Sequence, residues 1–298
     1  MDEPVAVEGR DSVGAVAVVT DSTTYLPEEL IARWQVERVN LYVGWGDDHR
    51  SEPEYEIQDF YDRLRSSEDL PSTSQPSVGD FLACYEPLAA AGRDVVSIHI
   101  AAGLSGTCES AREAARMIAE RGLPGRVEVV DAETGAGGLG CLVLAAAEAA
   151  AAGKPLDDVV AATRRTREGL EMWFCLDTLE YLRRGGRIGA AQALVGSALR
   201  IKPILTFGTE IAPVGRVRTH RRAMERMAAY LEELHERSAS AWFIQHAQSP
   251  QDAESMVAKG RELFGTEPLF CTEVGPVLGA HLGSGLLVGG IGCGPAAA

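Results

Sequence analysis

The segment AAGLSGTCESAREAAR, residues 101–116, places Ser105, Gly106 and Thr107 where an apolar run passes into a helical pattern. Three kinds of site use residues of these types: a serine nucleophile on a sharp turn, a phosphate-binding loop, and a set of donors that holds a carboxylate. The nucleophile pattern G-x-S-x-G needs a glycine where this chain has Thr107. The motif is therefore incomplete, and we keep a Ser-dependent hydrolase of acyl esters, using Ser105 and His281, only as an alternative hypothesis.

The glycines of the chain do not favour a phosphate-binding loop. The motif G-x-x-x-x-G-K-[ST] does not occur. Gly135, Gly137 and Gly140 match G-x-G-x-x-G, but the acidic residues that follow, Asp157 and Asp158, precede a helix instead of ending a strand. We interpret these glycines as positions where a helix packs closely on a sheet, and keep a dinucleotide-binding reductase as a third hypothesis.

Hydroxyl side chains recur in a second segment, STSQPS, which contains Ser72, Thr73, Ser74 and Ser77 and precedes a predicted helix. Helix N-termini have free N–H groups and a dipole that favours anions. In a parallel α/β sheet, the loops that follow the strands gather at one edge. Two such hydroxyl segments, with no clear nucleophile, predict a site that holds an anion.

The elements that must position these side chains alternate between strand and helix as far as residue 152. This alternation predicts an N-terminal α/β domain, residues 14–155, with a mainly parallel sheet and helices on both faces. Within it, the apolar run at 38–45 predicts one strand, and residues 71–77 are expected to form a polar loop.

Further along the chain the pattern changes to paired strands and helices. It predicts a C-terminal α/β domain, residues 156–294, with a mixed or antiparallel sheet. Residues 40–85 are expected to pack with this second domain, and residues 1–13 to form a disordered extension.

The net charge of −15 argues against general nucleic-acid binding, because phosphate contacts need clustered Lys and Arg. Residues 164–226 differ from the rest, with 13 Lys and Arg against 6 Asp and Glu. Part of this region is expected to face an anion. The alternative is that its arginines are solvated or form ion pairs on helix faces.

The remaining features indicate a reduced, cytoplasmic protein. The six cysteines form no C-x-x-C unit, so neither a zinc site nor a metal centre of another kind is expected. The N-terminus lacks the basic start and apolar stretch of a signal peptide. The apolar run near residue 145 is interrupted by Glu148 and is too short to span a bilayer, so stable membrane insertion is not expected.

Seven segments, taken in order, resemble the signature segments of the DegV family of fatty-acid-binding proteins. They are VVTDSTTYLPEEL, TSQPS, GLSGTCESA, LDTLEYLRRGGRI, IKPIL, GRVRT and GPVLGAHLGSG. The resemblance implies two α/β domains with one long-chain fatty acid held in a tunnel between them. It also implies a non-catalytic carrier with no cofactor, which presents the fatty acid carboxylate to a separate fatty acid kinase for acyl phosphate formation and phospholipid synthesis.

The same resemblance implies roles for individual residues. Thr73, Ser74, Ser105, the Gly106 amide and His281 would bind the carboxylate. Arg187 and Arg218 would face the kinase or the phosphorylated head group. The charged form of His281 is expected to be favoured beside a carboxylate. His99 and His246 lie in predicted strands and are given no role.

This chain departs from the family pattern at Ala101, Ala102 and Cys108, which affects the expected width of the tunnel. Residues 45–55 match the family loosely and are given no function.

Overall fold

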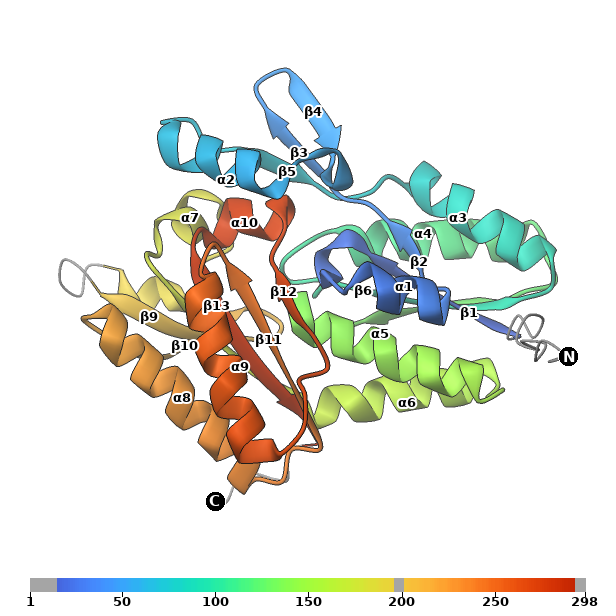
Figure 1. Ribbon diagram of the computed structural model, residues 1–298. Helices are drawn as coiled ribbons and strands as arrows, with labels where there is room; N and C mark the ends of the chain where they lie inside the picture. Colours follow the sequence, from blue (N-terminus) through green and yellow to red (C-terminus); the bar gives the residue numbers. More distant parts are fainter. Residues whose placement is uncertain (1–14, 196–200, 293–298) are drawn as a thin grey trace, which may run out of the picture.

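The computed structural model of the chain describes residues 15–195 and 201–292. Two α/β units lie side by side, and a small antiparallel sheet lies above the junction between them in Figure 1. The fold class predicted from the sequence is confirmed. The predictions for residues 1–13 and for the last residues of the second domain fall outside the described part of the chain.

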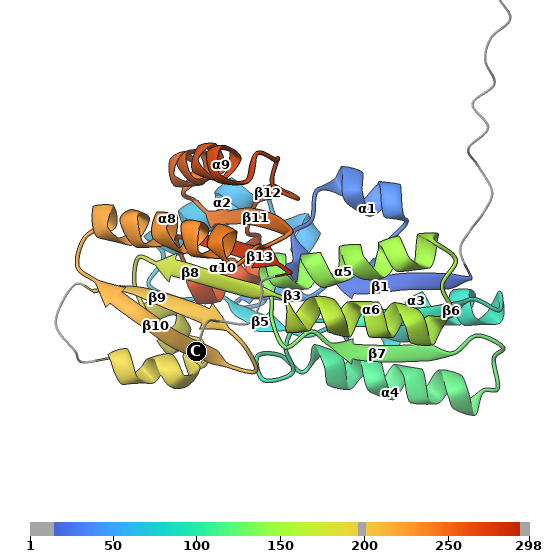
Figure 2. The ribbon, with the colours of Figure 1, turned by 90° about the horizontal axis from the view of Figure 1, so that it is seen from below.

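The first unit contains a parallel sheet in the order β2-β1-β6-β7. Alternate residues of β1 explain how both faces are covered: Val16 and Val18 join the core cluster formed with α5 and α6, whereas Ala17 and Val19 join the one formed with α3 and α4. Figure 2 shows α4 and α5 on opposite sides of this sheet. The elements are β1 (Val16–Asp21), α1 (Glu28–Trp34), β2 (Glu37–Val39), α3 (Val78–Ala90), β6 (Asp94–His99), α4 (Thr107–Glu120), β7 (Val127–Asp131), α5 (Ala136–Ala151) and α6 (Leu156–Glu168), with a 3-10 turn, η1, at Ser22–Thr24.

The second unit contains a mixed sheet in the order β10-β9-β8-β13-β11-β12, in which only β11 and β12 pair in parallel among the described strands. Helices α8 and α9 cover one face of it. The opposite face contributes Phe174, Phe207 and Leu287 to the large core cluster. The elements are β8 (Glu171–Leu176), α7 (Glu180–Arg184), η3 (Gly189–Leu194), β9 (Lys202–Phe207), β10 (Ile211–Val217), α8 (His220–Glu236), β11 (Ala241–Ala247), α9 (Pro250–Phe264), β12 (Cys271–Glu273), α10 (Pro276–Leu282) and β13 (Gly285–Ile291).

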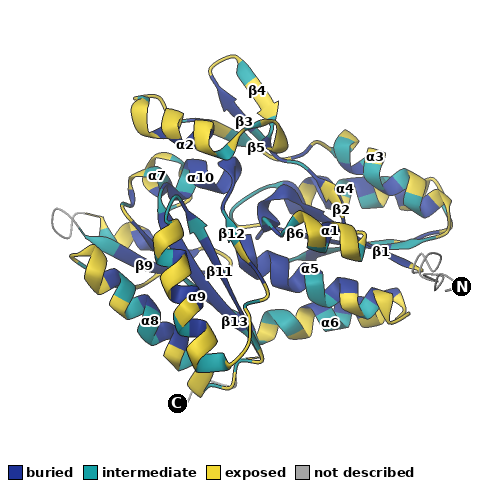
Figure 3. Ribbon diagram, viewed as in Figure 1, coloured by how far each residue is buried: buried dark blue, intermediate teal, exposed yellow. Residues whose placement is uncertain are grey.

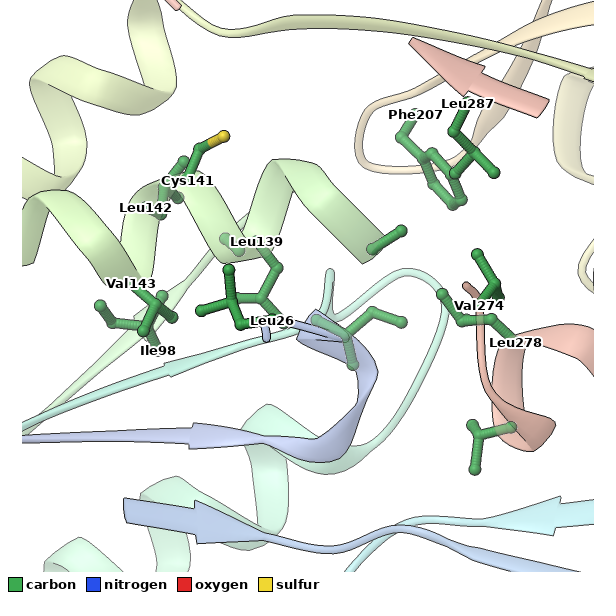
Figure 4. Close-up of a cluster of buried hydrophobic side chains, with 14 of the residues drawn as sticks. Leu26, Ile98, Leu139, Cys141, Leu142, Val143, Phe207, Val274, Leu278 and Leu287 are labelled. Atoms are coloured by element: carbon green, nitrogen blue, oxygen red, sulfur yellow. The ribbon is translucent and has the colours of Figure 1, made fainter. Parts of the chain in front are cut away.

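Helix α5 connects the two units, because it contacts strands of both sheets. A Cβ at Gly137 would lie 2.2 Å from the Phe243 ring of β11, so only glycine permits this approach. Figure 4 shows the shared core, with Leu26, Ile98 and Leu139 on one side and Phe207, Val274 and Leu278 on the other. The contact of Gly137 agrees with the packing interpretation of the glycine run.

The small sheet has the order β4-β3-β5 and is antiparallel. It corrects two predictions. The run at 38–45 is not one strand, because it divides between β2 of the parallel sheet and β3 of the small sheet; and the expected loop at 71–77 contains the short strand β5. The elements are β3 (Tyr42–Trp45), β4 (Asp48–Ser51), η2 (Glu52–Glu54), α2 (Ile57–Ser66) and β5 (Ser72–Ser74).

Helix α10 is enclosed by its neighbours, with α2 and α7 packed against it. Figure 3 shows α10 as mainly buried, in contrast to the exposed outer faces of α8 and α9. Across the described residues, no helix has the length and apolar composition needed to cross a membrane.

Candidate functional site

A cavity of about 320 Å³ lies where the two units and the small sheet meet, within the size range of small-molecule sites. Its wall is mostly apolar, with polar groups supplied by separate segments of the chain. The apolar lining residues are Leu41, Ile100, Leu104, Leu182, Phe207, Ile211, Val277, Leu278 and Leu282. The polar ones are Thr73, Ser74, Gln75, Ser105, Gly106, Arg187 and His281. All five residues predicted to bind the carboxylate therefore line one cavity.

Thr73 and His281 meet at the wall of this cavity. Strand pairing places Thr73 of β5 opposite Val43 of β3, and its Oγ1 lies 2.8 Å from His281 Nε2 of α10. The other side of the imidazole packs against Gly185, where a Cβ would lie 2.3 Å from Nδ1. The first glycine of the GGRI segment thus leaves the space that the His281 ring occupies.

Ser105 and Gly106 lie in the loop between β6 and α4. The Ser105 Oγ and Thr107 Oγ1 atoms are 2.8 Å apart, and Gly106 is the residue before the first turn of α4. The Gly106 N–H donates no hydrogen bond among the described residues. A hydroxyl and a free amide at the start of a 14-residue helix form a suitable environment for an anion.

The loop is held in place by contact with the second unit. A Cβ at Gly103 would lie 1.9 Å from the carbonyl oxygen of Thr209, in the turn between β9 and β10. Arg187 Nε donates to the Leu104 carbonyl at 3.3 Å. The second unit therefore fixes the loop that carries Ser105.

Burial, together with the neighbouring Arg187 charge, lowers the pKa of His281 to about 4. This differs from the expectation of a charged His281, because that expectation assumed a carboxylate beside the ring. Without such a carboxylate, the buried imidazole is neutral near pH 7. A neutral ring has one nitrogen that donates and one that accepts a hydrogen bond.

The two predicted arginines lie in different places. Arg187 lines the apolar cavity, whereas Arg218 lines a separate hollow together with Asp177, Arg183 and Lys202. Several other arginines of the basic region form ion pairs on helix surfaces, such as Arg183 with Glu180. The ion-pair interpretation therefore accounts for part of the charge of the basic region. Of Arg187 and Arg218, only Arg187 lies beside His281.

A second cavity of about 800 Å³ also has Thr73 and His281 in its wall. We call it the polar cavity. It shares Thr73, Arg187 and His281 with the apolar cavity, and the remaining lining residues include Trp45, Arg63, Ser67, Asp69, Ser72 and Arg184. The Arg63 guanidinium lies 4.2 Å from the Trp45 ring centroid and 3.7 Å from an Asp48 oxygen, and Arg184 donates to the Glu68 carbonyl. Three arginines against one aspartate make this cavity locally positive in an acidic protein.

The geometry disfavours the hydrolase hypothesis. Ser105 interacts with Thr107 and His281 with Thr73, and no hydrogen bond joins Ser105 to His281. His281 Nδ1 has no hydrogen-bond partner among the described residues, so no acid orients the ring.

An acid–histidine–serine arrangement does occur at Asp21, His99 and Ser97, extended by Tyr85. All four side chains are fully buried, three on strands of the parallel sheet and Tyr85 on α3, and no substrate can reach them there. This arrangement satisfies buried polar groups, and His99 lies in a strand, as predicted.

Gln75 was not assigned from the sequence, although it lies within TSQPS. Its amide nitrogen donates to Ser110 Oγ at 3.0 Å, and a Cβ at Gly106 would lie 2.1 Å from its side-chain oxygen. The apolar lining residues were not identified either, because their types are those of any core. Among the described residues, no group of three or more potential ligands is arranged to hold a metal ion.

Comparison with known proteins agrees with these features. The sequence model of the family described as "Uncharacterised protein, DegV family" matches residues 15–291. A DegV domain-containing protein of Streptomyces coelicolor is 39% identical over 276 residues, which cover 91% of this chain and 96% of that protein.

Two solved structures are similar along nearly their whole length. A fatty-acid-binding DegV family protein from Thermus thermophilus has a TM-score of 0.80 at 31% identity, covering 93% of this chain and 98% of that one. DegV of Bacillus subtilis, a fatty acid binding protein, has a TM-score of 0.82 at 30% identity, with 93% and 99% covered. The family match and the shared fold, over nearly the whole chain, show that this protein belongs to the DegV family.

Proposed function

We propose that this protein binds a long-chain fatty acid, with the acyl chain in the apolar cavity and the carboxylate at Thr73, Ser74, Ser105, Gly106 and His281. The observation that carries the proposal is the composition of one cavity: hydroxyl, amide and imidazole groups from separate segments share it with aliphatic and aromatic side chains. A fatty acid has the same division between a polar head and an apolar chain. The fatty acid binding of the Thermus and Bacillus relatives supports this choice.

The energetics suit a carrier. Burying about 14 methylene groups contributes roughly 11 kcal/mol before the cost of immobilising the ligand, which removes several kcal/mol. A carboxylate that leaves water needs donors, or its desolvation offsets this gain. The Gly106 N–H and the hydroxyls of Thr73 and Ser105 are such donors, and none of them carries a charge.

The proposal includes transfer of the head group to chemistry performed elsewhere. We infer that a separate fatty acid kinase phosphorylates the bound carboxylate. The polar cavity supports this inference, because its arginines line the same cavity as Thr73 and His281, which would hold the carboxylate. Arginine binds phosphoryl oxygens through paired donors. Arg187 would face the phosphorylated head group, and Arg218, in its separate hollow, would face the partner.

Native mass spectrometry of the purified protein tests the first part. We expect a mass increase equal to one fatty acid, which disappears on denaturation and returns when palmitate is added to delipidated protein. Protein that carries no lipid and does not bind added palmitate would refute the proposal.

The second part is tested by adding a fatty acid kinase and ATP to the loaded protein and measuring acyl phosphate as its hydroxamate. The loaded protein alone should produce none. A chromogenic acyl ester is the parallel assay for the hydrolase hypothesis: turnover that is lost in Ser105→Ala would replace the carrier function with hydrolysis.

A further inference from the structure

Glu52 is an acidic residue with only 4% of its surface exposed, in a segment to which the sequence assigned no function. Its Oε1 accepts a hydrogen bond from the Tyr25 hydroxyl at 2.8 Å and another from the Val277 N–H at 2.8 Å. Tyr25 in turn accepts from the Leu278 N–H at 3.1 Å. Burial raises the pKa of Glu52, so the chain keeps an ionisable group here despite its desolvation cost.

These bonds complete the N-terminus of α10. Pro276 begins the helix and has no N–H. The next two N–H groups donate hydrogen bonds to side chains: Val277 to Glu52 and Leu278 to Tyr25. First-turn N–H groups have no partner within a helix, and a negative charge near them is favourable. Helix α10 is therefore capped by side chains from two distant parts of the chain.

The contacts leave little freedom at this joint. A Cβ at Gly275 would lie 2.6 Å from the Tyr25 ring and 3.0 Å from Glu52 Oε1. Tyr25 has a φ of 47°, in the left-handed region that a tyrosine rarely adopts. A residue is held in such a conformation only where its surroundings determine it.

The small sheet also holds the other end of the same helix. Glu52 directly follows β4, which pairs with β3, and β3 pairs with β5, the strand that carries Thr73. Thr73 Oγ1 is 2.8 Å from Nε2 of His281, near the C-terminus of α10. The small sheet thus contacts the last turn of α10 through Thr73, and Glu52, the residue directly after the sheet's strand β4, contacts the first turn.

We propose that Glu52 is a positioning residue for ligand binding, because it fixes α10 so that His281 reaches Thr73 and so that Val277 and Leu278 form the cavity wall. This inference rests on the proposed fatty acid function. Glu52 does not line the cavity, so it acts through α10 and not by touching the ligand.

Palmitate binding to delipidated variants, measured by calorimetry, tests the proposal. We expect Glu52→Ala to weaken binding about tenfold, because it leaves buried N–H and hydroxyl groups without an acceptor. Glu52→Gln keeps an acceptor oxygen and should retain most of the affinity. Val257→Ala is the control: it removes buried volume in α9, away from the cavity, and should lower the melting temperature without changing affinity.

A double-mutant cycle separates positioning from general destabilisation. Because Glu52 acts in part through His281, Glu52→Ala should weaken binding less in a His281→Ala background than in wild type. Losses that add fully, wild-type affinity in Glu52→Ala, or an equal loss in Val257→Ala would each overturn the proposal. Should Glu52→Ala fail to fold, Tyr25→Phe removes only the hydroxyl and should give a smaller loss in the same direction.

Nitrogen NMR of His281 in the unliganded protein provides a readout that does not depend on binding. We expect Glu52→Ala to move the His281 signals toward those of a solvated histidine, and Val257→Ala to leave them in place. Wild-type protein that binds no palmitate would refute the proposed function alone, whereas unchanged His281 signals in Glu52→Ala would refute the positioning role alone.

Discussion

The two cavities that share Thr73, Arg187 and His281 differ in the rest of their walls. The rest of the apolar cavity is lined mainly by aliphatic and aromatic side chains, whereas the polar cavity adds serines, arginines and an aspartate to a few apolar residues such as Trp45 and Leu70. A ligand with its head at the shared residues would have its chain on one side and solvent-exposed cations on the other. Under the proposed function, affinity would come from the first cavity and access to the head group from the second.

Filling the apolar cavity should produce the largest effect. Leu104 is a half-buried lining residue on the loop, so Leu104→Trp would occupy space needed by several methylene groups. At about 0.8 kcal/mol per methylene, the loss of three or four should weaken palmitate binding roughly 100-fold. Leu269→Trp at an exposed position is the matched control. Equal affinity in the two variants would contradict the placement of the acyl chain.

Removing one head-group hydroxyl should have an intermediate effect. Thr73→Val keeps the shape of the side chain but removes the oxygen that faces His281, and we expect about tenfold weaker binding. Ser72→Ala, one residue away, removes a hydroxyl that lines only the polar cavity and should leave binding nearly unchanged. Similar losses in both variants would remove the distinction between the cavities.

Removing a cation from the polar cavity should affect transfer more than binding. For Arg184→Ala, we expect palmitate affinity to stay within about twofold of wild type, because exposed cations contribute little to binding an apolar chain. Acyl phosphate formation with an added kinase should fall several-fold. Arg218→Ala provides the comparison from the separate hollow. A fall in affinity with unchanged transfer would reverse the roles given to the two cavities.

The smallest effect concerns pH. Because the pKa of His281 is lowered from 6.5 to about 4, the unfolded chain binds a proton between these values that the native protein does not bind. Stability therefore rises with pH across this range. The contribution of His281 to the free energy of unfolding is fully present above pH 6.5 and is lost as the pH falls toward 4. Denaturant unfolding from pH 4 to 7 should show a shallower pH dependence in His281→Asn than in wild type.

A bound carboxylate should shift the pKa of His281 in the opposite direction. It favours the charged imidazole, so the pKa of His281 should rise when palmitate binds, and palmitate affinity should increase on acidification toward pH 5. NMR titration of His281 with and without palmitate measures both values. An unchanged pKa would place the carboxylate away from His281.

The sequence singled out polar residues that line the apolar cavity, but not the apolar residues of its wall. TSQPS and LSGT were identified because two hydroxyl segments precede predicted helices and match family segments in order, and residues of both line the cavity. Leu41, Phe207 and Ile211 could not be selected, since aliphatic and aromatic residues line cavities and fill cores alike. Glu52 was missed for a different reason: an acidic residue in a polar segment gives no sign that it will be buried against a distant helix.

The division of residues 38–45 shows the same limit. An apolar run predicts a strand, but it does not say which sheet the strand joins. Here β2 pairs with β1 while β3 pairs with β4 and β5. The positions of Arg187 and Arg218 illustrate the same limit, because two arginines of one basic region of the sequence lie in different hollows.

By itself, the sequence determined the order and type of most strands and helices, the parallel character of the first sheet and the residue types of the head-group site. Local periodicity and short motifs encode these features, because they depend on neighbouring residues. Only the tertiary structure decided that Thr73 meets His281, that Glu52 caps α10 and that a polar cavity shares Thr73 and His281 with the apolar one. These depend on contacts between residues more than 200 positions apart, and no local pattern specifies such distances.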